Sequence, residues 1–250
     1  MAELSGKHLA VIGGSSGIGL EVVKLAGEEG ASVTLIGRHA GRLDEARAAL
    51  QHNGIVVRDT LVCDAHDHPA LEDCFQQLAP CDHLVSMVGD VMGGGFLSAD
   101  MATISRVMHS KFLTNVLIGK LAAENIRPGG SLTFTAGTGG RAQDACASYV
   151  GNLAIQALAQ GLAAELAPVI RVNAVAPTWT VTPFWRQQPA EQIEQTRQHF
   201  ASIIPLGRTA QLAELATAYL FLMKNDFVTG QQLAVDGGIM LGWSDKAPAA

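Results

Sequence analysis

The 250-residue chain has little charge and no long hydrophobic run, and each shortage excludes a class of function. Charged side chains make up 16% of the residues, and the formal net charge is −6. A mildly acidic chain with scattered Lys and Arg lacks the basic surface that binds nucleic acid or an anionic membrane. No apolar stretch approaches the length of a membrane span. We therefore expect neither nucleic acid nor a membrane as a partner.

Cysteine is also scarce, and no pair has Cys-x-x-Cys spacing: the four are Cys63, Cys74, Cys81 and Cys146. This pattern supports neither a zinc knuckle nor a disulfide framework, and a reduced, cytoplasmic setting fits it best. Residues 1–7 show no signal-peptide pattern. The run 64–68, Asp-Ala-His-Asp-His, contains metal-ligand residue types, but we interpret it as a polar turn and helix N-cap before Pro69. We expect no metal.

Short apolar runs alternate with longer amphipathic segments. The runs are rich in β-branched residues and bounded by Gly, Pro or Asp, which is typical of parallel strands buried on both faces; they are 9–12, 32–36, 55–62, 83–87, 131–135, 170–175 and 232–235. Helical patterns lie between them, at 18–29, 41–52, 69–78, 101–125, 145–167 and 211–223. This alternation predicts right-handed crossovers and a doubly wound α/β sheet in a single domain, residues 1–243.

Two segments fall outside this rhythm. Residues 177–205 are rich in aromatics and proline and end in a short helical stretch, 190–200. Long connections in compact domains are usually lids or binding loops, although this one could simply pack its aromatics on the surface. We predict that residues 244–250 form a flexible tail at the end of the chain.

A glycine-rich loop follows the first predicted strand and opens the first predicted helix. It reads Gly-Gly-Ser-Ser-Gly-Ile-Gly, and its expected cofactor contacts are Gly13, Ser15, Ser16, Gly17, Ile18 and Gly19. Glycines let the backbone approach a pyrophosphate, and a helix N-terminus adds free N–H groups and partial positive charge. The strand–loop–helix context therefore predicts a dinucleotide site.

The end of the second predicted strand favours NADP(H) over NAD(H). An NAD site usually places an acid there to bind the ribose hydroxyls, but this region reads Leu-Ile-Gly-Arg-His. Arg38 could pair with a 2′-phosphate, and Arg42 lies one helical turn further on. The alternative is that both arginines form only a solvated face.

Together these motifs resemble the short-chain dehydrogenase/reductase family over nearly the whole chain. The loop glycines match, and Gly89 survives from the family's Asn-Asn-Ala-Gly segment. The run 171–177, Arg-Val-Asn-Ala-Val-Ala-Pro, is very close to the sixth strand of the family, and Asp-Gly-Gly at 236–238 matches its C-terminal signature. The resemblance implies a seven-stranded parallel sheet, a homotetramer or dimer, and cofactor contacts at Asp64, Gly89, Pro177 and Thr182.

The usual catalytic residues of that family are absent. The family uses a Tyr and a Lys four residues later, with a Ser and an Asn. The only tyrosines here, Tyr149 and Tyr219, are followed at that spacing by Leu153 and Met223. Alignment places Ser148 at the Tyr position and Asn152 at the Lys position. Gly137 then falls at the Ser position and Lys111 at the Asn position.

Other groups could therefore act in the cleft. A desolvated Lys111 could carry a useful pKa, and Arg141 could bind an anionic or carbonyl substrate. Each could instead have only a structural or solvated role. Candidate catalytic residues are thus Lys111, Ser148, Tyr149, Asn152 and Arg141. Candidate substrate contacts, mostly apolar or aromatic, are Met92, Phe96, Thr138, Trp179, Phe184 and Trp185.

Three functions are compatible with this pattern. The first is an NADP(H)-dependent oxidoreductase that reduces a carbonyl, imine or activated alkene of a small apolar or aromatic substrate, with the proton coming from Lys111, Tyr149 or water. The second is a non-redox enzyme, for elimination, isomerisation or cyclisation, that uses the same cleft. The third is a non-catalytic NADP(H) sensor or scaffold. We favour them in that order.

Overall fold

The computed structural model describes residues 2–141 and 145–241, and the tail expected at 244–250 lies outside them. Seven parallel strands form one sheet in the order β3-β2-β1-β4-β5-β6-β7. Their bounds are β1 His8–Ile12, β2 Ser32–Gly37, β3 Val57–Val62, β4 Cys81–Ser86, β5 Ile126–Thr135, β6 Arg171–Pro177 and β7 Gln232–Val235. The predicted doubly wound α/β fold is confirmed.

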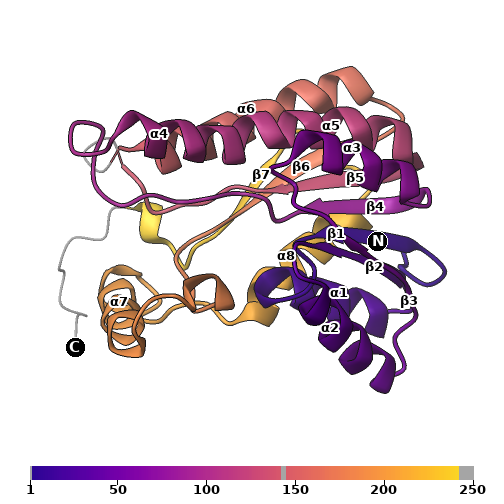
Figure 1. The fold of residues 1–250 in the computed structure, drawn as a ribbon, viewed down its shortest axis with the longest axis horizontal. Helices are drawn as coiled ribbons and strands as arrows, with labels where there is room; N and C mark the ends of the chain where they lie inside the picture. Colours follow the sequence, from indigo (N-terminus) through magenta and orange to yellow (C-terminus); the bar gives the residue numbers. More distant parts are fainter. Residues whose placement is uncertain (1, 142–144, 242–250) are drawn as a thin grey trace.

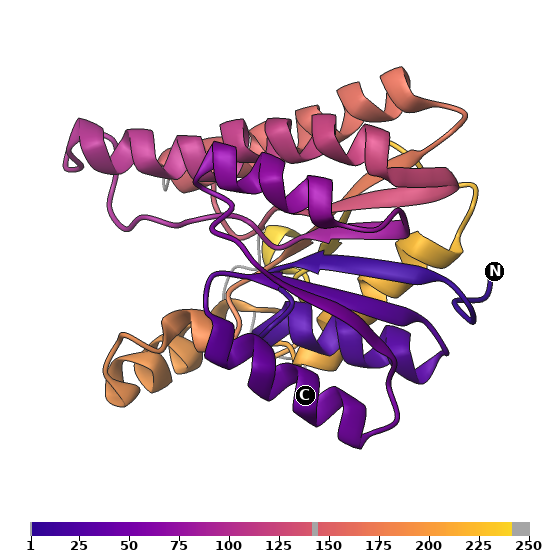
Figure 2. The same ribbon diagram turned by 45° about the vertical axis from the view of Figure 1, so that its right-hand side comes forward.

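Helices cover both faces of the sheet (Figure 1). The α-helices are α1 Gly17–Glu28, α2 Ala40–His52, α3 His68–Gln77, α4 Met101–Met108, α5 Thr114–Asn125, α6 Ala147–Leu166, α7 Ala190–Ile203 and α8 Leu212–Lys224. Helices α3, α4, α5 and α6 lie on one face and α1, α2 and α8 on the other, as the turned view in Figure 2 also shows. None of the helices in the described residues is long and apolar enough to cross a membrane.

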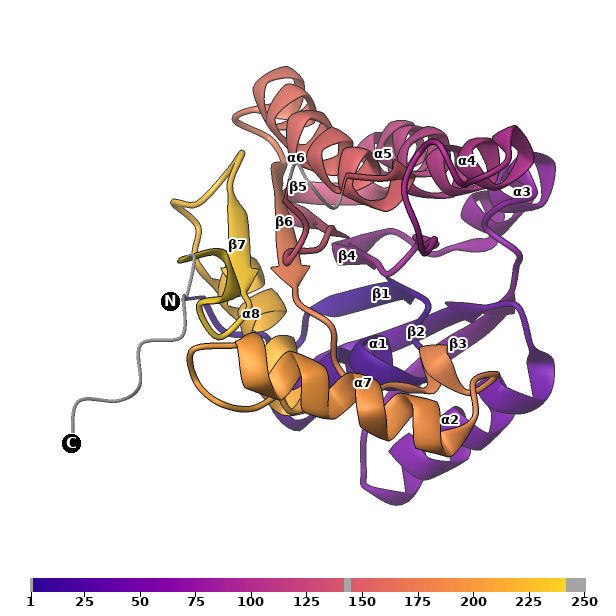
Figure 3. The same cartoon turned by 90° about the vertical axis from the view of Figure 1, so that its left-hand side faces the viewer.

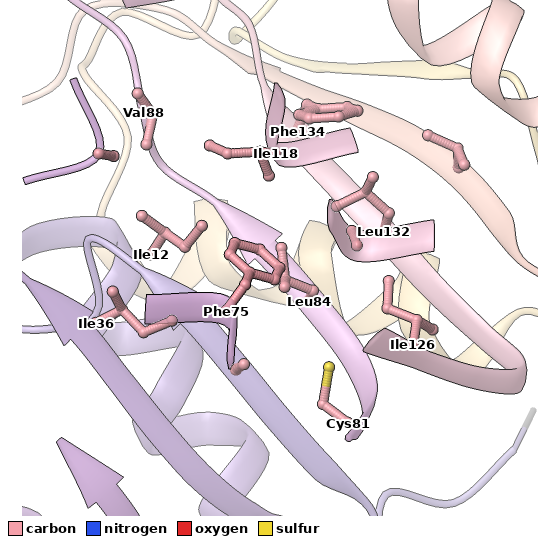
Figure 4. Packing of buried hydrophobic residues seen from close by; sticks show 14 of the residues in the cluster. Ile12, Ile36, Phe75, Cys81, Leu84, Val88, Ile118, Ile126, Leu132 and Phe134 are labelled. Carbon is pink, nitrogen blue, oxygen red and sulfur yellow. The ribbon is translucent and has the colours of Figure 1, made fainter. Parts of the chain in front are cut away.

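Each layer is held by its own apolar cluster. On the α3–α5–α6 side, Leu84, Leu132 and Phe134 of the central strands pack with Phe75 and Ile118 of the helices, and all five are at least nine-tenths buried (Figure 4). On the opposite side the largest buried side chain is Tyr219 of α8. Burial of apolar strands on both faces explains their continuous hydrophobic runs.

Local capping sets where several helices begin. Asp67 accepts a hydrogen bond from the Ala70 N–H at the start of α3, so the expected N-cap before Pro69 is confirmed. Gln211 and Glu214 form a capping box on α8, which therefore begins one residue later than the predicted 211. These caps satisfy N–H groups that the first turn of a helix leaves unpaired.

Two predictions were wrong: the start of the fifth strand and the continuity of the helix predicted over 101–125. Strand β5 begins at Ile126 rather than 131, because Ile126 already pairs with Cys81 of β4. The register then shifts, and the turn-like residues Arg-Pro-Gly-Gly at 127–130 lie within this irregularity. The single helix predicted over 101–125 is interrupted by a π-helical turn, η1, at His109–Leu113. Smaller differences of one to three residues occur at other ends, and α7 continues past the predicted 200 to Ile203.

Candidate functional site

The order of the strands places a crevice at the carboxyl ends of β1 and β4. Strand β1 pairs with β2 on one side and β4 on the other, so the chain reverses its winding direction between these neighbours. Ligands of open α/β sheets bind where the strand order reverses. Figure 3 views the molecule from this side, with α7 in the foreground below the ends of β1 and β4. A cavity of about 610 Å³ opens there.

The cavity brings together most of the predicted site residues. Its lining includes every residue proposed to bind the cofactor, namely Gly13, Ser15, Ser16, Gly17, Ile18, Gly19, Arg38, Asp64, Gly89, Pro177 and Thr182. It also includes Lys111, Ser148, Tyr149 and Asn152, together with Met92, Thr138, Trp179, Phe184 and Trp185. Two candidates lie elsewhere. Phe96 is 42% exposed outside the lining. Arg141 is also outside it and donates to the Ile239 carbonyl at 3.4 Å.

The glycine loop leaves no room for side chains where a dinucleotide would lie. Gly13 has φ +89°, and a Cβ there would stand 2.8 Å from Met87 Cβ. Gly17 has φ +57°, and a Cβ on Gly19 would collide with the Gly13 carbonyl oxygen. Ser16, the N-cap of α1, makes no side-chain cap, and the first turn holds no acid. The helix thus presents open N–H groups and its positive end to the cavity, which suits a pyrophosphate.

Two arginines and one carboxylate line the cavity beside the glycine loop, at the carboxyl ends of β2 and β3. Arg38 follows β2 and is exposed, and Arg42 is half-buried in the first turn of α2. Asp64 is the only carboxylate among the described lining residues; it lies after β3 and accepts from the His66 N–H. A guanidinium pair suits a dianionic phosphate. Together with the glycine cradle, these residues fit a phosphorylated dinucleotide.

A buried lysine, Lys111, also lines the cavity, beside the end of β4. Lys111 is 5% exposed and donates from Nζ to Asn152 Oδ1 at 2.8 Å. Burial lowers its pKa to about 8, and the neighbouring Cys146 opposes this weakly. No ion pair among residues 2–141 and 145–241 includes Lys111. Desolvation therefore makes the Lys111 ammonium a stronger acid than an ordinary lysine, and no carboxylate partner within these described ranges offsets this.

The backbone under Lys111 is fixed to the sheet. Asn115 donates to the Lys111 carbonyl at 2.8 Å and to the Val88 carbonyl at 3.1 Å. Its own Oδ1 accepts from Ser86 Oγ at 2.8 Å. All three side chains, those of Asn115, Ser86 and Lys111, are buried. The π-helical turn is thus tied to the end of β4, and π-turns occur frequently at functional sites.

The other hydroxyl candidates have different surroundings. Ser148 Oγ accepts from the Met92 N–H at 2.8 Å, so it fastens the loop after β4. Tyr149 is half-buried and lies against Gly140 at the cavity wall. Tyr219 is fully buried in α8, bonds to Thr135 Oγ1 at 2.9 Å, and has its pKa raised by burial. Tyr219 is therefore a core residue.

The segment 177–205 contributes an aromatic wall to one side of the cavity. Trp179 stacks on Trp185 with centroids 5.8 Å apart and on Phe200 at 5.4 Å. Phe184 meets Trp185 edge to face at 4.9 Å. Thr182 and Pro183 pass over Gly17, within 3.6 Å of where its Cβ would stand. The segment therefore covers the glycine loop and also lines the rest of the cavity.

Some lining residues were not predicted. Phe200 comes from the last predicted turn of its helix, and Arg186 follows the short 3-10 helix Pro183–Trp185. Thr178 also lines the cavity, and its buried Oγ1, like that of Thr138, has no partner among the described residues. None of these three positions lies in a motif or periodic pattern that would single it out in the sequence.

The fold and cradle define a Rossmann-type dinucleotide-binding protein, and comparison with known proteins identifies its family. A family model described as Enoyl-(Acyl carrier protein) reductase matches residues 12–240. The chain is 32% identical over 254 residues to the short-chain dehydrogenase/reductase malC of Malbranchea aurantiaca, covering 95% of this chain and 96% of that protein. It is 30% identical over 245 residues to the mouse 3-oxoacyl-[acyl-carrier-protein] reductase, covering 94% and 98%. The chain belongs to the short-chain dehydrogenase/reductase family.

Solved structures agree with this assignment. The MalC Reductase/Diels-Alderase from Malbranchea aurantiaca superposes with a TM-score of 0.85 at 27% identity, covering 95% of this chain and 98% of that one. A variant of the actinorhodin polyketide ketoreductase, solved with NADPH, gives a TM-score of 0.82 at 26% identity, covering 96% and 99%. A nicotinamide cofactor and oxidoreductase chemistry follow from the family.

Proposed function

We propose that this protein is an NADP(H)-dependent reductase of a small, apolar or aromatic substrate that carries a carbonyl, imine or activated alkene. The observation that carries the cofactor part is the pair Arg38 and Arg42 beside the glycine cradle, with no carboxylate directly after β2. A carboxylate there would repel a 2′-phosphate, whereas guanidinium groups bind it by charge-assisted hydrogen bonds. Two structural relatives were solved with NADPH, which supports the same preference.

The substrate part of the proposal comes from the aromatic wall. Trp179, Trp185 and Phe200 stack in series along the cavity. Flat aromatic surfaces favour a flat or apolar ligand, and few convergent polar groups then fix its orientation. The unpartnered hydroxyls of Thr138 and Thr178 and the Lys111 amine are such groups.

The bound nicotinamide would supply the hydride chemistry, and the chain would supply binding, orientation and a proton. The α1 N-terminus would hold the diphosphate, and Asn152, which the alignment places at the Lys position of the family, would bond the ribose hydroxyls through its amide. The segment 177–205 would exclude water from the reacting end.

The test is NADPH consumption, followed at 340 nm, with a panel of aromatic ketones, quinones, cyclic imines and enones. We expect steady oxidation with at least one flat aromatic member, such as 9,10-phenanthrenequinone. No consumption with any class would contradict the reductase function.

A second candidate is a non-redox cyclisation in the same cleft. It is favoured by the similarity to a protein whose structure is described as a Reductase/Diels-Alderase. The aromatic wall suits the preorganisation of a flat substrate for such a reaction. Product formation without loss of NADPH absorbance would support this candidate over the first.

We also propose that the chain forms a homo-oligomer. Leu113 in η1 and Val150 and Leu153 in α6 are apolar and 49%, 38% and 48% exposed on adjacent helices. Apolar patches on such helices mark association surfaces. Light scattering should give a dimer or tetramer, and Leu113→Glu with Leu153→Glu should reduce the mass; an unchanged mass would exclude this face.

A further inference from the structure

Lys111 is the one described cation that is both buried and in the cavity lining. The other lining cations that the structure describes, Arg38, Arg42 and Arg186, are exposed or half-buried. A Lys is almost never fully buried without a charged partner, because removing an ammonium from water is costly. Here the nearest acceptor is a neutral amide, Asn152. Such an unfavourable arrangement in a cavity is typical of a functional amine.

The neighbouring helix is shaped to admit this side chain. A Cβ on Gly151 of α6 would stand 2.6 Å from Lys111 Cδ and 2.9 Å from its Cβ. On the other side, a Cβ on Gly89 would stand 3.4 Å from Lys111 Nζ. The lysine stem therefore crosses from η1 to the cavity through a slot that two glycines leave open. Any larger residue at 151 would push the stem aside.

The amine keeps hydrogen atoms available. An ammonium has three N–H donors, and one is used on Asn152 Oδ1. The Asn152 amide nitrogen also lies close to Gly137, where a Cβ would approach it to 2.8 Å. Gly151, Gly89 and the Asn152 amide thus fix the direction of the Lys111 Nζ. Its other N–H donors remain available to the cavity.

We propose that Lys111 is the catalytic proton donor of the reduction and that Asn152 is its positioning residue. This inference rests on the proposed reductase function. A bound reduced nicotinamide would supply the hydride to the carbonyl carbon; as the C=O π-bond broke, Lys111 Nζ would transfer one proton to the oxygen. The products are an alcohol and the oxidised nicotinamide. The neutral amine then regains a proton from solvent.

The other hydroxyls are less suited to this role. Ser148 Oγ is engaged by the Met92 N–H, and an alcohol is a far weaker acid than an ammonium. Tyr219 is sealed in the core. Tyr149 lies against Gly140, and no tyrosine of the chain has a lysine four residues later. An amine with a pKa of about 8 is mostly protonated at neutral pH, yet acidic enough to donate.

The first experiment needs neither substrate nor cofactor. Acetic anhydride reacts with neutral amines, so the pH dependence of labelling reports the protonation of each lysine. Brief labelling of the apo-protein from pH 6 to 11, followed by digestion and mass spectrometry, should give a midpoint near 8 for Lys111. The exposed Lys120 of α5 serves as the reference for reagent activity in the same digest. A Lys111 midpoint above about 10 would overturn the proposal.

The second experiment measures catalysis with NADPH and 9,10-phenanthrenequinone. Lys111→Met should lower kcat by about 10²–10⁴-fold, the usual contribution of a general acid, while NADPH binding by fluorescence is retained. Lys120→Met is the matched control and should leave kcat unchanged. Unchanged kcat in Lys111→Met would overturn proton donation. Absence of turnover by the wild-type protein with the whole panel would instead overturn the reductase function on which it rests.

Asn152→Asp tests the positioning role by a readout that misfolding does not produce. A carboxylate at this distance should raise the Lys111 pKa by about 1–3 units. The alkaline limb of the kcat–pH profile, and the labelling midpoint, should then move upward together. A lower kcat with an unmoved profile would mean that Asn152 does not act through Lys111. Borohydride trapping of a substrate adduct on Lys111 would show a nucleophile in place of an acid and would also overturn the proposal.

Discussion

At the scale of single residues, the burial of Lys111 costs stability. Its pKa is lowered from 10.5 to about 8 by desolvation. Below pH 8 the amine is charged in both the folded and the unfolded chain, and the folded chain carries the full penalty. Between pH 8 and 10.5 the unfolded chain binds more protons, so stability rises with pH. Lys111 therefore destabilises the fold at neutral pH, a cost that functional groups often carry.

Lys111→Met should consequently stabilise the protein at pH 7. Each pKa unit corresponds to about 1.4 kcal/mol, and the lost hydrogen bond to Asn152 offsets about 1 kcal/mol of that gain. We expect a net increase of about 1–3 kcal/mol in the free energy of unfolding, shrinking toward pH 10. Urea unfolding at both pH values checks this, with Lys120→Met as the control. A destabilised variant at pH 7 would contradict it.

The sequence indicated Lys111 by elimination but did not indicate its surroundings. The missing Tyr–Lys pair could be read directly, because the chain has only two tyrosines. The slot formed by Gly151 and Gly89 could not, because a glycine within a helical pattern has no visible partner until helices pack. The same limit applies to Arg141 and Phe96, whose loops place them outside the cavity lining. Loop side chains follow tertiary contacts that periodicity does not encode.

At the scale of elements, strands and long helices followed from apolar patterning. Buried parallel strands have short β-branched runs, and each of the seven predicted runs overlaps a strand. The π-helical turn η1 was missed because its one-residue irregularity leaves the hydrophobic repeat of 101–125 almost intact. The start of β5 was missed because Pro128 and its two following glycines are typical turn residues.

The segment 177–205 makes a separate prediction about substrate binding. Trp179 lies between Trp185 and Phe200 in the aromatic wall. Trp179→Leu should raise KM for an aromatic substrate about 10-fold, since each aromatic pair contributes about 0.5–1.5 kcal/mol beyond its buried area. NADPH affinity should stay the same. Steady-state kinetics with 9,10-phenanthrenequinone measures both, and the exposed Phe227→Leu is the control. An unchanged KM would remove the wall from the substrate site.

At the scale of the whole molecule, the strand order brings residues from distant parts of the sequence to one cavity. The reversal of strand order between β1 and β4 brings the glycine loop, Arg38 and Lys111 to the same edge, although they are far apart in sequence. Helix α7 lies on the same side of the molecule, below this edge in the view of Figure 3. The phosphorylated dinucleotide would therefore span from the arginines to the lysine, and its binding is the basis for every catalytic proposal.

Calorimetric titration of the protein with NADPH and NADH tests this claim most directly. Loss of one charge-assisted contact to the 2′-phosphate costs about 1.5–3 kcal/mol, so NADPH should bind at least 10-fold more tightly than NADH. Arg38→Ala combined with Arg42→Ala should remove the difference, while Arg47→Ala on the same helix should not. Binding of NADH as tight as that of NADPH would contradict the assigned preference, and no heat with either cofactor would contradict the dinucleotide site.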